Sequence, residues 1–376
     1  AKNYKDVTVI TSTNYYSELI NELKTNKGNT SLKFREKMSR IAFSETSYYD
    51  SVISNYLNNK SKIIFPEKKV IYGNLIERLR YGENPHQEGA IYSQKNDFKI
   101  KKIHGKQLSY NNYSDLLSAL TISKTFPNNT GTVIVKHSNP CGASINKNNL
   151  ESFKSALACD PLSAFGGIVS CNFKIKKNVA FELNKIFLEV IVANGFDKDA
   201  LKILKTKKNL RLVDASNYSL SEISKFSSHN DLVLFQSEDN KIFSKKDLVV
   251  VSKKKPSKYQ FENLLFAFNI CRYVKSNGIV LVCDKSTIGI GSGQPSRLDS
   301  CKIAVEKMEK FSKTKNDIVA ASDAFFPFVD GIEELIQKGV SAVIQPKGSI
   351  RDKEIIKFAD ATGTILVFSK SRHFRH

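Results

Sequence analysis

Clustered cysteines, long apolar runs and a leader-like opening are what this sequence lacks. Its six cysteines are scattered, with no CxxC pair, which argues against a disulfide scaffold or a structural zinc site. No apolar run approaches the roughly 20 residues that span a bilayer. No basic segment followed by an apolar one opens the chain, so secretion is unsupported. With 376 residues, 41% of them hydrophobic, we expect a soluble cytoplasmic protein of two or three domains.

Acidic residues are scarce relative to basic ones: 37 Asp and Glu stand against 58 Lys and Arg, and the net charge is +21. Such an excess can indicate nucleic-acid binding, because a basic surface releases counterions from phosphates. The basic residues form no single block, however, and this spread favours a general compositional bias. The excess would also attract small anionic substrates. We therefore expect neither a nucleic-acid partner nor a membrane partner.

Strand-like and helix-like segments alternate along the chain. Helices are expected at residues 16–23, 30–57, 150–157 and 300–311, the second of them capped by the hydroxyls of Thr30 and Ser31. Strands are expected at residues 7–11, 132–135, 167–171, 279–283, 287–291, 342–344 and 365–368, and a lysine-rich linker at 58–69. This alternation predicts an α/β protein in which helices cover a mixed sheet.

A faint internal echo links Ala158–Phe165 with Ala321–Phe328. In each, we expect an Asp to follow a helix and to precede a turn that contains aromatic residues. If the echo is real, it indicates two related subdomains that face one another with a site between them. A match this short also arises by chance.

The pair Lys136-His137 follows an apolar strand and precedes an expected turn at Asn139–Gly142. Catalytic groups commonly sit in loops at strand ends, where the rigid sheet positions them. His can act as a base near neutral pH, and an adjacent cation can stabilise developing negative charge. The alternative is a His that only hydrogen-bonds within a turn, beside a surface Lys.

Four other segments each have a functional interpretation and an ordinary one. The run Arg80–Gln87 offers a guanidinium for phosphate or carboxylate, or is an ordinary loop. The glycine-rich Gly289–Arg297 could bind an anion before a helix, or be the end of a hairpin; it is neither a P-loop nor a dinucleotide fingerprint. The aromatic run Ala324–Phe328 could hold flat heterocycles, or belong to the core. The basic end Arg372–His376 would ordinarily be a frayed tail.

Taken in order, seven motifs resemble the AICAR transformylase region of the bifunctional purine biosynthesis family. Four stand in the first part of the chain: Leu79–Gln87, His104–Asn112, Val135–Gly142 and Asp160–Gly167. Three more follow: Gly289–Arg297, Ser322–Phe328 and Arg372–His376. The resemblance is dense from Leu79 to the last residue and looser before it. A chance match of seven ordered motifs is very improbable.

The resemblance implies the fold and the domain organisation. In that family the transformylase part has two cytidine-deaminase-like three-layer αβα subdomains, and it forms a homodimer with sites at the interface. We expect these subdomains at residues 66–215 and 216–376. Residues 1–65 would be a remnant of the methylglyoxal-synthase-like α/β domain that carries IMP cyclohydrolase activity, together with a linker. Most of that domain's pocket has no counterpart here, so we expect no cyclohydrolase activity.

The resemblance also implies the reaction: transfer of a formyl group from 10-formyltetrahydrofolate to the 5-amine of AICAR, giving FAICAR and tetrahydrofolate in de novo purine synthesis. His137 would be the base, Lys136 would stabilise charge, and Asn277 would orient the reacting group. The residues implied to bind AICAR are Arg80, Tyr81, Gly166, Glu189, Asn277, Arg297, Phe325 and Arg372. Those implied on the folate side are Leu298, Phe325, Asp330, Ser349 and Ile350.

A deaminase-like fold raises the rival chemistry of a zinc deaminase, which needs H-x-E and P-C-x-x-C motifs. Here Ser138-Asn139 follow His137, and Gly142 to Ser144 follow Cys141, so these ligands are missing from the sequence. We expect no zinc, and a structural monovalent cation is left open. A non-catalytic sensor of purine nucleotides is the alternative function, although the presence of both Lys136 and His137 argues for an enzyme.

Overall fold

The computed structural model covers the whole chain and describes every residue except 95–97, 221–224 and 313–315. The chain divides into two compact units. The smaller comprises Ala1–Arg78 and Gly89–Phe98, and the larger comprises Leu79–Glu88 and Lys99–His376.

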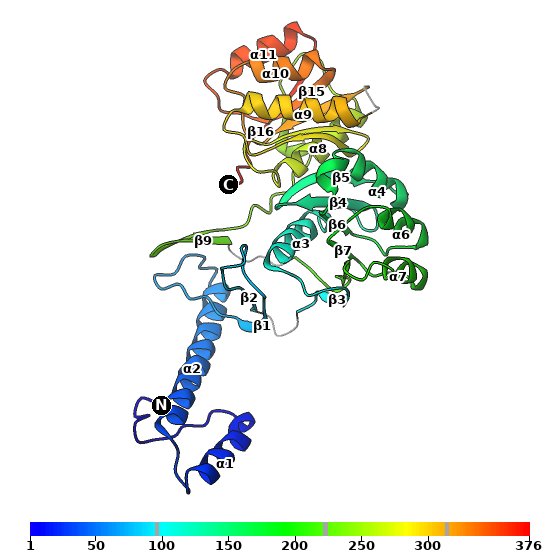
Figure 1. Cartoon of the computed structure of the whole chain (residues 1–376). Coiled ribbons are helices and arrows are strands. Elements are labelled where there is room, and N and C mark those ends of the chain that lie inside the picture. Colours follow the sequence, from blue (N-terminus) through cyan, green and yellow to red (C-terminus); the bar gives the residue numbers. More distant parts are fainter. Residues whose placement is uncertain (95–97, 221–224, 313–315) are drawn as a thin grey trace. The chain divides into compact units, whose positions relative to one another are not determined.

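The smaller unit consists of helices and one hairpin (Figure 1). Its elements are the 3-10 helix η1 (Thr13–Tyr15), helices α1 (Tyr16–Thr25) and α2 (Leu32–Lys60), and the antiparallel strands β1 (Asn74–Arg78) and β2 (Ala90–Ser93). Ser31 caps α2, its hydroxyl accepting a hydrogen bond from the amide of Phe34. Both expected helices are therefore confirmed, and α2 continues to Lys60, into the expected linker.

The strand expected at Val7–Thr11 is wrong, because this segment is irregular. Backbone carbonyls of the opening residues accept hydrogen bonds from side chains of α2 and not from a neighbouring strand. Arg35 donates to the carbonyls of Tyr4 and Lys5, and the Ser39 hydroxyl donates to the carbonyl of Ala1. An apolar run without a partner strand cannot form a ladder.

The larger unit is built on one twelve-stranded mixed sheet, which confirms the α/β class. Its first half contains α3 (Tyr110–Ser123), β4 (Gly131–Lys136), β5 (Asn139–Ile145), α4 (Asn149–Ala158), α5 (Pro161–Ala164), β6 (Ile168–Cys171), α6 (Lys177–Asn184), β7 (Val190–Ala193), α7 (Lys198–Leu204) and β8 (Arg211–Asp214). Its second half contains α8 (Lys258–Cys271), β12 (Ile279–Cys283), β13 (Ser286–Gly291), α9 (Arg297–Phe311), β14 (Ile318–Ser322), α10 (Asp330–Gln337), β15 (Val340–Pro346), α11 (Asp352–Ala361) and β16 (Ile365–Ser369).

The two halves repeat one topology. Each begins with a helix and an antiparallel hairpin, then a helix, and continues through three parallel strands. The sheet order is β11-β16-β15-β14-β12-β13-β5-β4-β6-β7-β8-β3, with β5 and β13 meeting at the centre. Antiparallel strands β3 (Lys101–His104) and β11 (Leu248–Val250) close the two ends. The η2 turn (Lys245–Asp247) precedes β11, and β9 (Lys225–His229) pairs with β10 (Leu232–Gln236) in a separate hairpin.

The larger unit does contain an internal repeat, but the two segments of the echo do not occupy equivalent positions in it. Ala158–Phe165 begins at the end of helix α4, whereas Ala321–Phe328 begins inside strand β14, so Asp160 and Asp323 are not equivalent. The halves also lie side by side in one sheet. Ser144 and Ser286 pair across the seam, with their hydroxyl oxygens 2.7 Å apart, and the Ala143 amide donates to the Thr287 hydroxyl.

Helices cover both faces of this sheet (Figure 1). Alternate strand residues such as Ile134, Val169 and Ile191 pack into a core with α4, α6 and α7. Helix α3 packs on β4 and β6 from the opposite face, as α8 does on β12 and β14. A second core joins α9, α10 and α11 to the strands of the second half.

One expected turn is part of a strand, and the first glycines of the Gly289–Arg297 run lie in the strand expected at residues 287–291. Asn139–Gly142 opens β5, and the register shifts between Ile134 and Val135, where Cys141 is an extra residue in β5 and Val135 faces Pro140, which has no amide to donate. Gly289 and Gly291 lie inside β13, where an added Cβ would meet backbone oxygens of α9 at 2.1 and 1.8 Å. These two glycines therefore allow close strand–helix packing and do not form an anion-binding loop.

A buried ion pair joins the two halves beside the seam. Asp160, 3% exposed, accepts from the Lys307 ammonium at 2.8 Å and from the Ser163 amide and hydroxyl. Burial alone would raise the pKa of the Asp160 carboxyl, but these donors outweigh burial and hold that pKa below its usual value. The pair thus contributes stability that is present above the unfolded pKa of about 3.9 and is lost as the pH falls through the lower folded pKa.

Replacing Lys307 with Met is expected to lower the free energy of unfolding at pH 7 by about 1–3 kcal/mol, because it leaves a buried carboxylate short of a donor. Denaturant unfolding at a series of pH values measures this. The difference from wild type should shrink as the pH falls through the lowered folded pKa of Asp160, because the carboxyl is then protonated in both proteins. Lys302→Met, at an exposed position of the same helix, is the control. A loss that does not depend on pH would contradict this account.

Candidate active site

All the residues implied by the resemblance lie along one edge of the twelve-stranded sheet. Strands β4, β13, β14, β15 and β16 end at this edge, and strands β5 to β8 and β12 begin there, as their registers require. Segments that are far apart in the sequence thus contribute to one line of loops because the sheet aligns them.

His137 occupies the turn of the β4–β5 hairpin. Lys136 pairs with Asn139, which leaves His137 and Ser138 as a two-residue loop with φ angles of +54° and +58°. Two positive φ angles define a type I′ turn. The carboxylate of Asp115 on α3 accepts from both turn amides. The His137 side chain is exposed at the tip of a hairpin whose strands are buried.

Lys136 points along the same edge toward the start of β6. Its ammonium donates to the carbonyl of Phe165 at 2.8 Å, and an added Cβ at Gly166 would lie 4.0 Å from it. Gly166 has φ +74° and donates its amide to the carbonyl of Phe187. A side chain at residue 166 would therefore be strained and would reduce the space beside the Lys136 ammonium.

Asn277 lies across the seam from this hairpin, in the segment that leads into β12. The two segments are joined by the Asn139 side chain, which accepts from the amide of Lys275 at 2.9 Å. The Asn277 amide group donates to the carbonyls of Gln294 and Pro295, and its oxygen accepts from the Arg297 guanidinium at 2.6 Å. Asn277 is thus held in one orientation.

Arg297 is occupied by side chains of the protein. One of its terminal nitrogens donates to the Ser322 hydroxyl at 2.7 Å and to the carboxylate of Asp323, and the other donates to Asn277. Arg297 and Asp323 are 8% and 0% exposed. The buried guanidinium, implied by the resemblance to bind AICAR, here holds Asn277.

The C-terminal residues are ordered along this edge, so a frayed tail is not what the structure shows. The amide of His373 donates to the carbonyl of Asp323, and the amide of Arg375 donates to the Ser276 hydroxyl. The ring of His373 is buried and pairs with Asp239. These contacts fix the backbone on both sides of Arg372 beside the loop that carries Asn277.

A basic cavity of about 470 Å³ lies at the other end of the same edge. The Glu189 carboxylate lines this cavity and forms an ion pair with Arg211 at the start of β8. The other charged lining residues are Lys106, Lys207 and Lys208. Phe187 lines this cavity and also contacts Gly166, so the cavity adjoins the Lys136 region. Its charge suits an anionic ligand.

The residues implied on the folate side follow strands β13, β14 and β15. Leu298 and Asp330 occupy the first turns of α9 and α10. Phe325 is half-buried and Phe326 is core, so the core interpretation of the aromatic run holds for Phe326 alone. Ser349 and Ile350 follow β15, with Ile350 fully exposed.

Arg80 and Tyr81 lie in the segment Leu79–Glu88, which connects β1 to β2 and belongs to the larger unit. The Asn111 side chain, in the first turn of α3, donates a hydrogen bond to the carbonyl of Glu83 and so connects this segment to the helix. The Arg80 guanidinium lies 5.6 Å from the centre of the Tyr81 ring. Both residues are accessible, with Arg80 exposed and Tyr81 half-buried.

Comparison with known proteins shows the family to which the chain belongs. The family model described as "AICARFT/IMPCHase bienzyme" matches residues 1–307. The chain is 44% identical to the bifunctional purine biosynthesis protein PurH of Persephonella marina and 40% identical to that of Aquifex aeolicus, covering 100% of this chain and 74% of each relative. The chain belongs to the AICARFT/IMPCHase bienzyme family. It is a member of the bifunctional purine biosynthesis proteins.

Sequence reasoning missed two acidic residues of this AICARFT/IMPCHase family member. Asp115 binds the His137 turn, and Asp323 binds Arg297 and the Ser276 hydroxyl. Asp115 had no signal beyond its place in an ordinary helix. Asp323 stood in a quoted motif, Ser322–Phe328, and could have been singled out there as an acidic residue at the end of an apolar strand.

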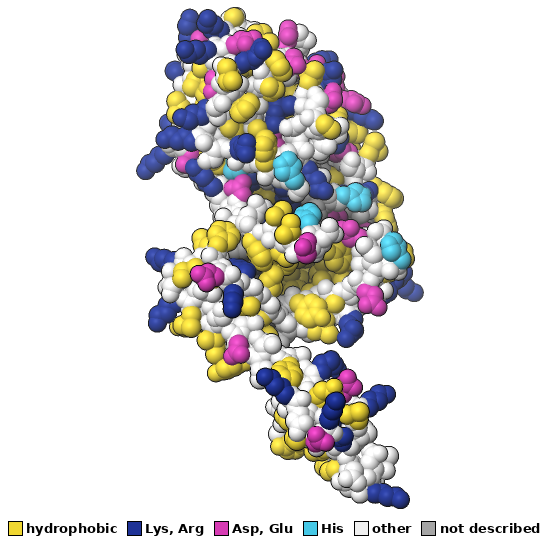
Figure 2. Space-filling model, turned by 90° about the vertical axis from the view of Figure 1, so that its left-hand side faces the viewer, with side chains coloured by type: hydrophobic (Ala, Val, Ile, Leu, Met, Phe, Trp, Pro, Cys, Tyr) yellow, Lys and Arg dark blue, Asp and Glu magenta, His cyan; other side chains and the backbone are white. Residues whose placement is uncertain are grey.

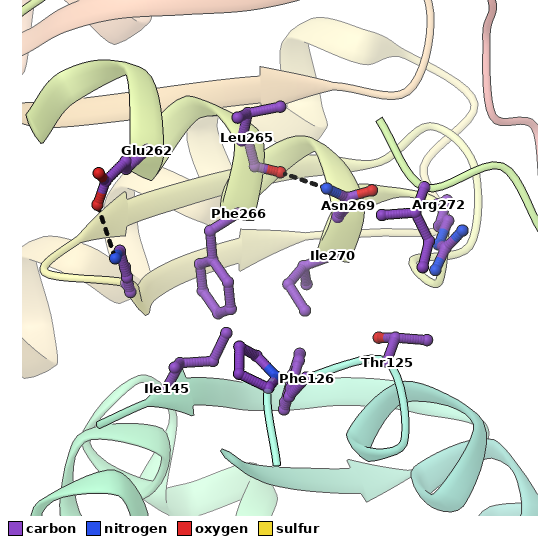
Figure 3. Close-up of a pocket in the computed structure, with 12 residues that line it drawn as sticks. Thr125, Phe126, Ile145, Glu262, Leu265, Phe266, Asn269, Ile270 and Arg272 are labelled. Atoms are coloured by element: carbon purple, nitrogen blue, oxygen red, sulfur yellow. Dashed lines mark hydrogen bonds and ion pairs between the residues drawn. The ribbon is translucent and has the colours of Figure 1, made fainter. Parts of the chain in front are cut away.

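A second cavity, of about 270 Å³, contains none of the predicted site residues (Figure 3). Phe126, Ile145, Phe266 and Ile270 give it apolar walls on either side of the gap between the two halves. Ile145 is the last residue of β5, and Lys285 lies in the turn between β12 and β13. Both are at the sheet edge opposite the site. This cavity therefore plays no part in the site described above.

Basic side chains are scattered over the face of this family member that is drawn in Figure 2, and its cysteine thiols are buried. On the face drawn in Figure 2, Lys and Arg side chains are scattered among acidic and uncharged ones. All six cysteines are buried, and burial raises the pKa of Cys141 and of Cys159 to about 12. Among the described residues, no helix is long and apolar enough to cross a bilayer, and no three His, Cys, Asp or Glu side chains are grouped as metal ligands.

Proposed function

We propose that this chain is an AICAR formyltransferase that uses 10-formyltetrahydrofolate as the formyl donor. The observation that carries the proposal is the joining of the Lys136–His137 hairpin to the Asn277 segment through the Asn139–Lys275 hydrogen bond. A base, a cation and an oriented amide thereby share one sheet edge. The family assignment supplies the substrates.

The chemistry required explains these three side chains. The AICAR amine is a poor nucleophile, because its lone pair is delocalised into the imidazole carboxamide. His137 removes a proton from this amine as the amine attacks the formyl carbon. Lys136 stabilises the oxyanion of the tetrahedral intermediate and supplies a proton to the departing folate nitrogen. Asn277, held by Arg297, orients the reacting group through its remaining hydrogen-bonding capacity.

The basic cavity beside Glu189 and Gly166 is proposed to receive the phosphorylated end of the nucleotide. Its lysines and Arg211 favour a phosphate group, and Glu189 can accept from ribose hydroxyls. Phe325 offers a half-buried aromatic face to a flat ring on the folate side. Arg80 and Arg372 are further guanidinium groups for an anionic ligand.

A homodimer with shared sites is part of the proposal. Strands β7 and β14, next to Glu189 and Phe325, are six positions apart in the sheet. At about 4.8 Å per strand, this separation is roughly 29 Å along the edge. One nucleotide cannot contact both ends of such an edge in one chain. A second copy, placing its second half against the first half of its partner, would bring the two sets of residues together.

The test is to mix the purified chain with AICAR and 10-formyltetrahydrofolate and to follow tetrahydrofolate by absorbance. We expect formation that requires both substrates and saturates with AICAR. Omission of AICAR gives the rate of folate breakdown without transfer. AICAR that binds, measured by calorimetry, without any turnover would overturn the transferase and favour a nucleotide sensor.

A further inference from the structure

The turn that carries His137 has an unfavourable local sequence. In a type I′ hairpin both central residues have positive φ, and Asn-Gly, Asp-Gly and Gly-Gly are the preferred pairs. Here the pair is His137-Ser138, with φ angles of +54° and +58°. A left-handed conformation costs roughly 1–2 kcal/mol for such residues. Something outside the turn must therefore favour this conformation.

The carboxylate of Asp115 supplies that stabilisation. Its Oδ2 atom accepts from the His137 amide at 3.0 Å, and its Oδ1 atom accepts from the Ser138 amide at 2.6 Å and from the Ser138 hydroxyl at 3.4 Å. Hydrogen bonds from backbone amides to a carboxylate are charge-assisted and stronger than neutral ones. Both oxygens of one carboxylate thus bind the two consecutive amides of the turn.

Asp115 is itself held on a rigid element. Ser109 and Asn112 form a capping box at the start of α3, so this end of the helix is fixed. The next residue, Leu116, is completely buried beneath the helix. The adjacent Ser114 hydroxyl also lies 3.0 Å from the hydroxyl of Ser138. The helix therefore presents the Asp115 carboxylate to the turn from a fixed position.

We propose that Asp115 is a positioning residue that fixes the imidazole of His137 for catalysis by binding both amides of its turn. The inference rests on the proposed function, in which His137 is the base. It explains why a sequence unsuited to a type I′ turn persists at this hairpin: the turn needs a His, and the neighbouring helix offsets the strain. A rule broken locally at a functional site is then compensated nearby.

The test is Asp115→Asn, which keeps the size of the side chain but has one acceptor oxygen and presents an amino group to the other turn amide. Because misplacing a catalytic group by about 1 Å can cost on the order of 10²-fold in rate, we expect kcat to fall by about 10–10²-fold. The KM for AICAR should stay near the wild-type value, because the Asp115 carboxylate binds the His137–Ser138 turn, which supplies none of the residues proposed to bind the nucleotide. A wild-type kcat in Asp115→Asn would overturn the proposal.

Two variants separate positioning from general stability. Asp197→Asn removes a carboxylate that also accepts a backbone amide, from Ala200 at 2.6 Å, at the start of α7 near the other edge of the sheet. It should lose stability without losing kcat. Adding Ser138→Gly to Asp115→Asn relieves the strain at the second turn position, and should restore most of the rate. An equal loss of kcat in Asp197→Asn, or no recovery in the double variant, would contradict the inference.

Hydrogen exchange separates failure of this inference from failure of the proposed function. The amides of His137 and Ser138 should exchange faster in Asp115→Asn than in wild type, whether or not the protein transfers formyl groups. Wild type without turnover, but with this acceleration, would remove the transferase and keep the role of Asp115 in the turn. Unchanged exchange would overturn the role of Asp115 even in an active enzyme.

Discussion

Replacing Arg297 with Met is expected to destabilise the larger unit by about 3–5 kcal/mol, the usual cost of breaking a buried ion pair by removing one partner. The carboxylate of Asp323 is completely buried, and without Arg297 it keeps the Ser276 hydroxyl as its remaining side-chain donor. The oxygen of Asn277 loses its donor as well. Denaturant unfolding followed by circular dichroism measures the loss.

A second substitution shows whether the stranded charge causes this loss. Arg297→Met combined with Asp323→Asn removes the buried charge together with its partner, so the double variant should be more stable than the sum of the two single effects predicts. Arg297→Met with the stability of the wild type would show that the pair contributes little. The same variant should also lower kcat, because Asn277 is no longer oriented.

Replacing His137 with Ala should reduce kcat by at least about 10²-fold, the lower range for the loss of a general base. The side chain is exposed at a hairpin tip, so its removal should leave the fold and the affinity for AICAR nearly unchanged. Steady-state kinetics, with AICAR binding measured by calorimetry, separate the two effects.

The control for that experiment is His229→Ala, at an exposed position in the separate β9–β10 hairpin. It should retain the wild-type kcat. If His137→Ala also retained the wild-type kcat, the chain could still be a formyltransferase, but another group would have to accept the proton of the amine.

The sequence was sufficient to predict the elements with strong local signals. Ser31 marked the start of α2, and the apolar runs in β4, β6, β12, β15 and β16 were found as strands. The wrong predictions share one physical cause, which is tertiary context. The apolar run at Val7–Thr11 has the composition of a strand but is irregular in the fold. Gly289 and Gly291 lie in the strand expected at residues 287–291, but the anion-binding alternative does not hold for these two glycines, because a helix packs closely on them.

The site could be foreseen only in part. The motif Val135–Gly142 contains Lys136 and His137, and the resemblance implied Asn277. The joining of these residues through Asn139 depends on β5 and β13 meeting at the seam. One pair of residues in the register defines that contact, and no local pattern specifies it. The contribution of Asp115 is likewise hidden, because an Asp in the second turn of a helix is ordinary until the hairpin packs against it.

The most direct test of the central claim is to supply 10-formyltetrahydrofolate carrying carbon-13 in its formyl group, together with AICAR, and to follow the label by NMR. The account predicts that the label appears as a formamide on the 5-amine of the nucleotide, at a rate that matches tetrahydrofolate formation and falls sharply in His137→Ala. Label that remains on the folate, or is released as formate while AICAR is unchanged, would contradict formyl transfer by this chain.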